Sequence, residues 1–419
     1  MQFVAKLKRT MPISQVKIFN DPVYGFISFP KPSLLLDLVD HRYFQRLRRI
    51  SQTALTNYVY PGAHHTRFHH ALGAYHLMSQ AVESLRQKGV EITEGEAEGV
   101  CAAILLHDIG HGPFSHALEH TIIDVHHEDL SLMFMHQLNE EFDGRLQTAI
   151  DIFEDRHPKH FLHQLVSGQL DMDRMDYLMR DSFFTGVSEG IVGYDRIIKM
   201  LNVVDNQLVV EEKGIYSVEK FLISRRLMYW QVYLHKTVLS AEQMLMKVLK
   251  RAKELSNHKN TEGVELVSFG ELSYFLNEKR FDTNKKNVKD LVERFAKLDD
   301  FDIIASLKVW STNSDFVLSY LSESILNRKL FKLEWRNEPF GPDAVDKMRH
   351  KLVTKVPAQT DMSYLVFEGE ESNQTYNKQK DEIKILSKNG EVSSITQIMD
   401  YELASKIVTK HYLCYPKSL

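Results

Sequence analysis

The segment from Glu94 to Ile109 constrains the fold more than any other part of the sequence. Apolar residues occupy nearly the whole circumference of a helix drawn over it, and the run from Val100 to Leu106 is uninterrupted. A helix that is apolar on all sides must be buried, so we expect it to lie at the centre of the molecule, surrounded by other helices. Gly110, Gly112 and Pro113 follow it directly and end it.

Helical periodicity continues along most of the chain and predicts a mostly α fold. Apolar residues recur at intervals of three and four from Thr66 to Gln87, for example. Near the end of the chain, Asn389-Gly390 between two short apolar runs, 383–386 and 392–395, favours a β-hairpin. We expect helices at 34–52 (one or two), 66–87, 94–109, 115–120, 128–139, 146–153, 158–165, 169–181, 218–256, 269–277 and 286–298, a strand near 207–210 and a polar loop at 370–381.

The character of the sequence changes after about residue 257, and a Pro- and Gly-rich stretch follows at 339–342. We therefore predict two parts: a helical catalytic core over residues 1–256, and a smaller C-terminal lobe of helices and strands over residues 257–419. A chain of 419 residues is long enough for one large core and an accessory lobe.

Composition excludes several classes of protein. Lys and Arg number 52 and Asp and Glu 56, a net charge of −4, so no nucleic-acid-binding or membrane surface is indicated. The first 15 residues lack the apolar core of a signal peptide. The two cysteines, Cys101 and Cys414, do not form a disulfide framework and fit a reducing compartment. We expect a cytoplasmic protein.

Histidine is unusually concentrated, because 12 of the 20 histidines lie between His64 and His136. Imidazole binds metal ions and transfers protons near neutral pH, so this concentration indicates a functional site. Within it, His107 and Asp108 stand at the end of the buried helix, where both are costly to bury without a partner. A metal ion is one such partner, although the pair alone could also be a helix cap.

Two other segments favour the metal interpretation. Arg67-Phe68-His69-His70 opens the earlier apolar helix. In the helix that follows Leu170, Asp173, Tyr177 and Asp181 are spaced at i, i+4 and i+8 and share one face. Asp176 and Arg180 on that helix are expected to form an ion pair on a solvated face.

The order His70, then His107-Asp108, then Asp173 resembles the HD-domain phosphohydrolases, and within them the deoxynucleoside triphosphate triphosphohydrolase branch. The resemblance runs from about Lys17 to Leu249. It rests on these segments: Asn20-Asp21-Pro22, Phe44 to Arg48, Tyr60 to Ala63, Arg67-Phe68, His70 to Gly73, His107 to His116, Asp171 to Asp181, and Tyr233 to Lys236.

The resemblance implies an HD-domain helical core, one divalent metal ion per chain and hydrolysis of a nucleotide, most specifically of a dNTP to deoxynucleoside and inorganic triphosphate. The metal ligands would be His70, His107, Asp108 and Asp173. Catalytic roles fall to His116, His127, His111 and Glu128, with His116 first and His127 second as proton donor. Substrate would contact Gln52, Arg67, Arg174, Tyr177, Asp181, Arg225 and Tyr233.

Physical chemistry supports this assignment. A triphosphate carries several negative charges, and a metal with Arg67, Arg174 and Arg225 is suited to bind them. A tyrosine ring beside the deoxyribose leaves little room for a 2′-hydroxyl. Leu234 departs from the mammalian pattern, which has a polar residue touching the sugar, so strict deoxyribose selection is not implied.

A second set of residues resembles the family's nucleotide-sensing site, which lies between subunits. It comprises Lys17, Asn20, Asp40, Gln45 and Arg48, and more loosely Arg196, Arg328 and Lys332. An activating nucleotide and a homo-oligomer, a dimer or tetramer, would follow, although the Gln45–Arg49 run could also be the polar face of a helix.

Two alternatives to the dNTP triphosphohydrolase remain open at this point. One is an HD-type nucleotide monophosphatase or cyclic-dinucleotide phosphodiesterase, although Asp195 after Gly193-Tyr194 breaks the Gly-Tyr-Pro signature of one such group. The other is a non-catalytic nucleotide sensor.

Overall fold

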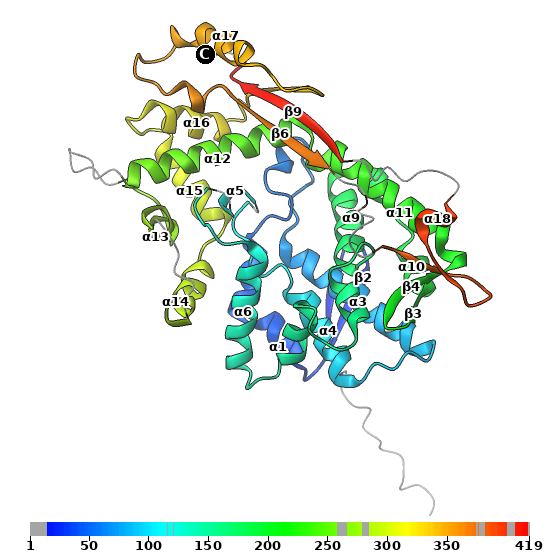
Figure 1. The fold of residues 1–419 in the computed structure, drawn as a ribbon. Coiled ribbons are helices and arrows are strands. Elements are labelled where there is room, and N and C mark those ends of the chain that lie inside the picture. The colour runs from blue at the N-terminus through cyan, green and yellow to red at the C-terminus, as the bar shows by residue number, and fades with distance from the viewer. Residues whose placement is uncertain are drawn as a thin grey trace, which may run out of the picture.

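The computed structural model describes residues 15–114, 116–119, 121–257, 266–278, 285–373, 376, 382–399 and 407–417. The molecule is mostly α, as predicted, with three small sheets (Figure 1).

Helices dominate the first half of the chain. They are α1 (Leu34–Asp40), α2 (Arg42–Gln45), η1 (Arg46–Arg49), η2 (Thr56–Tyr58), α3 (Arg67–Gln87), α4 (Glu94–Leu106), α5 (His116–Glu119), α6 (His127–Glu141), α7 (Gln147–Phe153), α8 (His160–Val166), α9 (Met172–Thr185), η3 (Ser188–Gly190) and α10 (Tyr194–Met200). The helices after residue 210 are η4 (Glu212–Gly214), α11 (Ile215–Met228), η5 (Tyr229–Tyr233), α12 (Lys236–Asn257), α13 (Leu272–Asn277), α14 (Lys285–Phe295), α15 (Asp300–Trp310), α16 (Phe316–Leu326), α17 (Pro342–Val353), η6 (Met362–Tyr364) and α18 (Ile395–Ile398).

The central helix is α4. It begins with a capping box, in which Thr93 and Glu96 bond each other's backbone N–H groups. From Gly99 to Leu106 every residue is buried, as the apolar circumference predicts. Helices α3, α7 and α8 pack against it, so the end of α4 is held inside a layer of helices.

The strands form three separate sheets. They are β1 (Val16–Asp21), β2 (Gly25–Pro30), β3 (Leu201–Val204), β4 (Gln207–Glu211), β5 (Lys332–Arg336), β6 (Phe367–Asn373), β7 (Lys384–Leu386), β8 (Val392–Ser394) and β9 (Val408–Tyr415). Strands β1 and β2 form an antiparallel hairpin, and the other two sheets have the orders β3-β4-β7-β8 and β5-β9-β6. The predicted hairpin is β7–β8, with Gly390 at positive φ in its turn.

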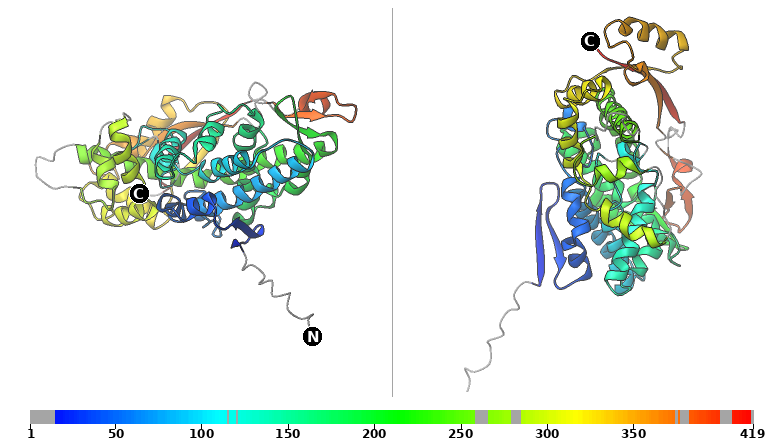
Figure 2. Two further views of the ribbon diagram at one scale, coloured as in Figure 1. Left: turned by 90° about the horizontal axis from the view of Figure 1, so that it is seen from below. Right: turned by 90° about the vertical axis from the view of Figure 1, so that its left-hand side faces the viewer.

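The chain after residue 257 packs against the first half of the chain. Strand β7 pairs in parallel with β4, and the guanidinium of Arg46 donates to the carbonyl of Leu298 at 2.8 Å. One hydrophobic core includes side chains from both sides of residue 257. The views in Figure 2 show the later helices and strands lying against the earlier ones. The division at 256/257 stays a prediction.

Two expectations about elements are wrong. The segment 218–256 is not one helix: α11 passes into a π-helical turn, η5, and α12 starts afresh at Lys236. The turn contains neither glycine nor proline, so no breaker residue marks it. In the expected polar loop, residues 370–373 belong to strand β6, paired with β9; residues 374–375 and 377–381 lie outside the described part of the chain.

Candidate metal centre and substrate pocket

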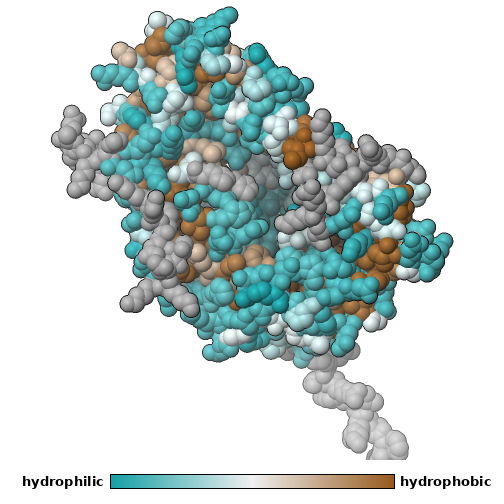
Figure 3. Space-filling model, in the orientation of Figure 1, coloured by the Kyte–Doolittle hydropathy of each residue, from teal (hydrophilic) through white to brown (hydrophobic). Residues whose placement is uncertain are grey.

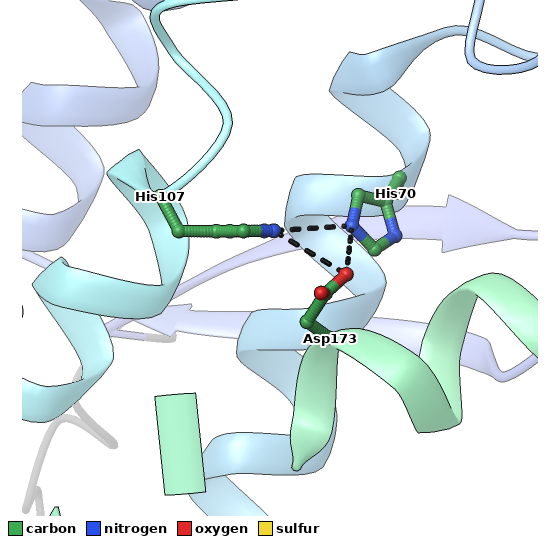
Figure 4. A group of neighbouring side chains, drawn as sticks. All are labelled: His70, His107 and Asp173. Carbon is green, nitrogen blue, oxygen red and sulfur yellow. Dashed lines mark hydrogen bonds and ion pairs between the residues drawn. The ribbon is translucent and has the colours of Figure 1, made fainter. Parts of the chain in front are cut away.

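Three helices bring two histidines and an aspartate together. His70 lies in the first turn of α3, His107 at the end of α4 and Asp173 in the first turn of α9. The two Nε2 atoms are 3.3 Å apart, and Asp173 Oδ1 lies 3.1 Å from that of His70 and 3.5 Å from that of His107 (Figure 4). The three donor atoms therefore face one common point.

The outer nitrogen of each imidazole is occupied. His70 Nδ1 lies 2.7 Å from Asp176 Oδ2, and His107 Nδ1 lies 2.6 Å from the carbonyl oxygen of Ile104. Both partners are acceptors, so each Nδ1 donates a proton to its partner and each Nε2 faces the common point as the ligand atom. Two Nε2 atoms at this distance need a proton or a metal ion between them, and a bound ion would displace the proton.

Asp176 is itself held in the core, and here the expected solvated face is wrong. Asp176 and Arg180 do form the predicted ion pair, at 3.0 Å, but both side chains are fully buried. Arg180 also donates to Asp21 at 2.8 Å. Gly73 on α3 makes room for the pair, because a Cβ there would stand 1.9 Å from Asp176 Oδ1.

Asp108 lies at the rim of this group. Its Oδ1 is 3.4 Å from His107 Nε2 and its Oδ2 is 3.7 Å from His70 Nε2. Arg67 Nη1 donates to the same Oδ2. Asp108 is thus shared between the candidate ligands and the arginine predicted to bind phosphate.

The arrangement fits a divalent ion. Neighbouring ligands of one ion at about 2.0–2.2 Å are themselves about 3.0–3.6 Å apart, which matches the separations among His70, His107 and Asp173. Two neutral imidazoles and carboxylates are ligands that many divalent metals accept. His70, His107 and Asp173 could hold such an ion, with Asp108 beside them.

Charges around the cluster shift its pKa values strongly. Burial alone lowers the pKa of His70, but its hydrogen bonds to Asp173 and Asp176 raise it to about 10. Burial alone raises the pKa of Asp108, but Arg67, His107 and His111 hold it well below its usual range. Burial and the charge of Arg67 lower the pKa of His111 to about 3, so this imidazole is neutral at pH 7.

The cluster opens into a cavity of about 890 Å³. Figure 3 shows the surface hollowed near the centre of the face, among hydrophilic side chains. Eleven of the predicted site residues line the cavity: Gln52, Arg67, Asp108, His111, His127, Asp173, Arg174, Tyr177, Asp181, Arg225 and Tyr233.

Cationic side chains surround the inner end of the cavity. Arg174 is fixed by Asp171, the cap residue of α9, which accepts from its backbone N–H and from its guanidinium. Arg225 Nε and Nη1 are buried and have no hydrogen-bond partner among the described residues, and neither does Gln52 Oε1. Buried polar atoms without partners in a pocket wall are available to a ligand.

The outer end of the cavity is built by α12 and the C-terminal strands. Its wall comprises Leu234, Val238, Leu239, Glu242, Gln243 and Met246 with Gly369, Glu370, Glu371 and Tyr412. Burial and the charge of Glu371 raise the pKa of Glu242 to about 7. None of these residues except Leu234 was predicted to be near the site; Gly369, Glu370, Glu371 and Tyr412 belong to β6 and β9, which lie far along the chain.

Two of the histidines predicted to be catalytic flank the segment that leads into α6. His111 lies before this segment, and His127 is the first residue of α6. The rings of His111 and His127 are 4.1 Å apart, and His127 Nδ1 lies 3.1 Å from Glu119 Oε2. Glu119 was not predicted. Glu128 points away: its carboxylate is exposed, 3.8 Å from His126. The side chain of His116 lies outside the described part of the structure.

The residues predicted to sense a nucleotide partly meet on the opposite side of α3. Arg48 Nε donates to Gln45 Oε1 at 2.8 Å, and its guanidinium lies over the Phe68 ring at 3.5 Å. Asp40 is close enough to act on the charge of Arg48, and Lys17 and Asn20 are exposed on β1. Arg196 and Arg328 instead donate to the carbonyls of Lys213 and Tyr58, and Lys332 pairs with Glu334.

Among the described residues, no helix is long and apolar enough to cross a membrane. Cys101 and Cys414 are both buried and unbridged.

Comparison with known proteins gives a consistent result. Residues 67–181 match the model of the HD domain, and residues 192–294 match that of the HD associated region. The uncharacterized protein YwfO of Bacillus subtilis is 32% identical over 97% of this chain and 94% of its own. The crystal structure of a phosphohydrolase from Bacteroides thetaiotaomicron is 51% identical, with a TM-score of 0.90 over 96% of this chain and 100% of that one. The human deoxynucleoside triphosphate triphosphohydrolase SAMHD1 is 26% identical over 82% of this chain and 59% of its own length.

Proposed function

Since this chain belongs to the HD-domain phosphohydrolases, in the branch that includes SAMHD1, we propose that it hydrolyses deoxynucleoside triphosphates to deoxynucleoside and inorganic triphosphate. The observation that carries the proposal is the inner end of the cavity, where the His70–His107–Asp173 cluster faces three arginines. A cavity of about 890 Å³ is large enough for a whole nucleotide.

The three arginines supply the positive charge that binding of a triphosphate requires. Arg225 brings two buried nitrogens that have no hydrogen-bond partner in the described part of the chain, and Arg174 is fixed in place by Asp171. Guanidinium groups bind phosphate oxygens through paired hydrogen bonds, which are stronger where water is excluded. A substrate with a single phosphate would reach fewer of these guanidinium groups than a triphosphate does.

His70, His107, Asp108 and Asp173 would hold one divalent ion. Bound there, such an ion supplies polarisation of a phosphoryl oxygen and a lowered pKa for a coordinated water. Asp176 and the carbonyl of Ile104 keep both imidazoles in the tautomer that binds.

The protein's own acid–base groups would act at the leaving oxygen. When water adds to the α-phosphorus, the bond from phosphorus to O5′ breaks and O5′ takes up a proton. We assign the donor to His116 first and to His127 second. His127 is held at Nδ1 by Glu119, whereas His111 is neutral at pH 7 and suited to hydrogen bonding. General acid catalysis typically contributes about 10²–10⁴ in rate.

Identification of the phosphate product tests the proposal. The purified protein, loaded with Mn²⁺ or Mg²⁺, is incubated with dATP, and the products are separated by ion-exchange chromatography. We expect deoxyadenosine and inorganic triphosphate in equal amounts. Release of single phosphates, or hydrolysis of dAMP or a cyclic dinucleotide instead, would assign a different phosphohydrolase reaction; tight binding without turnover would indicate a sensor.

A matched pair of variants tests the proton donor. His116→Ala should lose most turnover but keep its metal and bind dATP. His136→Ala changes a histidine on the exposed side of α6 and should retain wild-type turnover. Near-native turnover of His116→Ala would move the role to His127 or to water.

A further inference from the structure

A buried histidine stands behind the pocket wall. His65 is 1% exposed, and its Nε2 lies 2.6 Å from Asp181 Oδ1. Its ring stacks on Phe184 with centroids 4.5 Å apart. Its backbone carbonyl accepts from the N–H of Gln52 at 3.1 Å. His65 lines no part of the cavity, yet it contacts two residues that do.

Asp181 links this histidine to the pocket surface. Its Oδ2 accepts from the hydroxyl of Tyr233 at 2.6 Å, so both carboxylate oxygens are engaged by the protein. The carboxylate is 2% exposed, and short hydrogen bonds to a buried charge are strong and directional. The orientation of Asp181 therefore depends on His65, and that of Tyr233 depends on Asp181.

Tyr233 packs against the hydrophobic core at the edge of the pocket. It ends the π-helical turn η5, where the chain changes direction before α12, and its ring meets those of Tyr177 and Tyr229 edge-on, with centroids 6.1 and 5.3 Å away. Its hydroxyl makes the hydrogen bond that fixes where the ring stands in the pocket wall. Tyr233 lines the cavity together with Gln52 and Tyr177, so the position of its ring sets the width of the pocket at this point.

We propose that His65 is a positioning residue for sugar selection: through Asp181 it holds Tyr233 where the ring excludes a 2′-hydroxyl. This inference rests on the proposed function, because it requires a nucleotide in the cavity. His65 itself touches neither substrate nor metal, and it acts only through the two residues in front of it.

The test is the ratio of kcat/KM for dATP to that for ATP. His65→Phe keeps the aromatic stack on Phe184 and removes the N–H donor, and Tyr233→Phe removes the other hydrogen bond to Asp181. Each should lower the ratio about tenfold, the order expected for loss of one hydrogen bond to a charged group. The double variant should lower it no further than either single one, because both act on one unit.

Two matched variants separate positioning from a general structural effect. His65→Gln retains an N–H donor of similar reach and should restore most of the ratio. His64→Phe makes the same substitution at the exposed neighbouring position and should leave it unchanged. Metal content should equal that of the wild type in all variants.

The outcomes distinguish this inference from the proposed function. A ratio near one in the wild type, or an unchanged ratio in folded His65→Phe or Tyr233→Phe, overturns the role of His65 while dNTP hydrolysis stands. If the product is not triphosphate, the proposed function fails. The ratio of the dissociation constants for dATP and ATP then still tests whether His65 and Tyr233 select against a 2′-hydroxyl. Should His65→Phe not fold, Tyr233→Phe and His65→Gln decide. Absence of any nucleotide binding overturns both.

Discussion

At the scale of single residues, the histidines of the metal cluster depend on groups that never face the ion. Asp176 fixes the tautomer of His70, and the ion pair with Arg180 holds Asp176 in turn. The pair fits there because Gly73 has no side chain. His107 and Asp108 stood out in the sequence because they end a helix that is apolar nearly all round, and the resemblance to the family added His70 and Asp173. The role of Asp176 was not predicted, because its partner His70 lies on α3, far away in the sequence, and the spacing to Arg180 is also typical of a surface ion pair.

Retention of the metal ion should differ between a variant of a candidate ligand and a variant of the residue that supports a ligand. Asp173→Ala removes a ligand and should abolish binding of the divalent ion. Asp176→Asn should weaken binding about 10–100-fold, as is typical when the partner of a ligating histidine is changed. Metal analysis after dialysis against a graded chelator measures both. Asp129→Asn, an exposed acid on α6, is the control, and full occupancy in Asp173→Ala would remove Asp173 from the ligand set.

The acid at the outer end of the pocket should make stability depend on pH. Burial and Glu371 raise the pKa of Glu242 from 4.5 to about 7, so between these values the folded protein keeps a proton that the unfolded chain has released. The contribution of Glu242 to stability therefore falls as pH rises from about 4.5 and is lowest above 7. Glu242→Gln should gain about 1–2 kcal/mol more at pH 8 than at pH 5.

Thermal unfolding of both proteins at the two pH values measures that gain. Glu140→Gln, on the exposed side of α6, should show no such difference. A Glu242→Gln variant whose advantage is the same at pH 5 and pH 8 would contradict a raised pKa.

At the scale of elements, helix α9 organises the site. Its N-terminal turn carries Asp173, and the same face carries Tyr177 and Asp181 into the cavity, while Asp176 faces α3. The shared face of Asp173, Tyr177 and Asp181 follows from helical periodicity and was predicted from the sequence, whereas the burial of Asp176 against α3 was not. The π-helical turn η5 was not predicted, because its five residues include no glycine or proline that would indicate a break between α11 and α12.

The contact between α3 and α9 should tolerate no side chain at Gly73. A methyl group there would lie 1.9 Å from Asp176 Oδ1 and 2.1 Å from Arg180 Nη2. Gly73→Ala should therefore cost about 1–3 kcal/mol of stability, as is typical of overpacking, and should lower metal affinity as well. Gly95→Ala, in α4 with nothing within 4 Å, should be neutral or slightly stabilising. Equal melting temperatures for the two variants would contradict this account.

At the scale of the whole molecule, the pocket combines residues that are far apart in the chain. Gln52, Asp173 and Tyr412 line one cavity, and the core extends across the predicted boundary at 257. Local sequence patterns identified the helical inner end. The outer end depends on β6 and β9 folding back onto α12, a long-range pairing that no local pattern specifies.

The oligomeric state is the property of the whole molecule that we expect a nucleotide to regulate. We expect a dimer or tetramer whose stability or activity rises with dGTP bound at Gln45 and Arg48, since a ligand shifts an equilibrium by its differential affinity. Gln45→Ala combined with Arg48→Ala should abolish the response and leave metal content unchanged. Light scattering and turnover of a second dNTP, with and without dGTP, measure it. A monomer with identical rates in both conditions would defeat regulation and leave catalysis standing.

The wall that Tyr412 contributes to the pocket also sets an order of events during synthesis. Asp173, the last of the candidate ion ligands, leaves the ribosome well before strand β9 is translated. At about 5–20 residues per second, the interval between Asp173 and Tyr412 is on the order of ten to fifty seconds. All four candidate ion ligands are therefore made before this side of the cavity exists, and the complete pocket has to wait for almost the whole chain to be made.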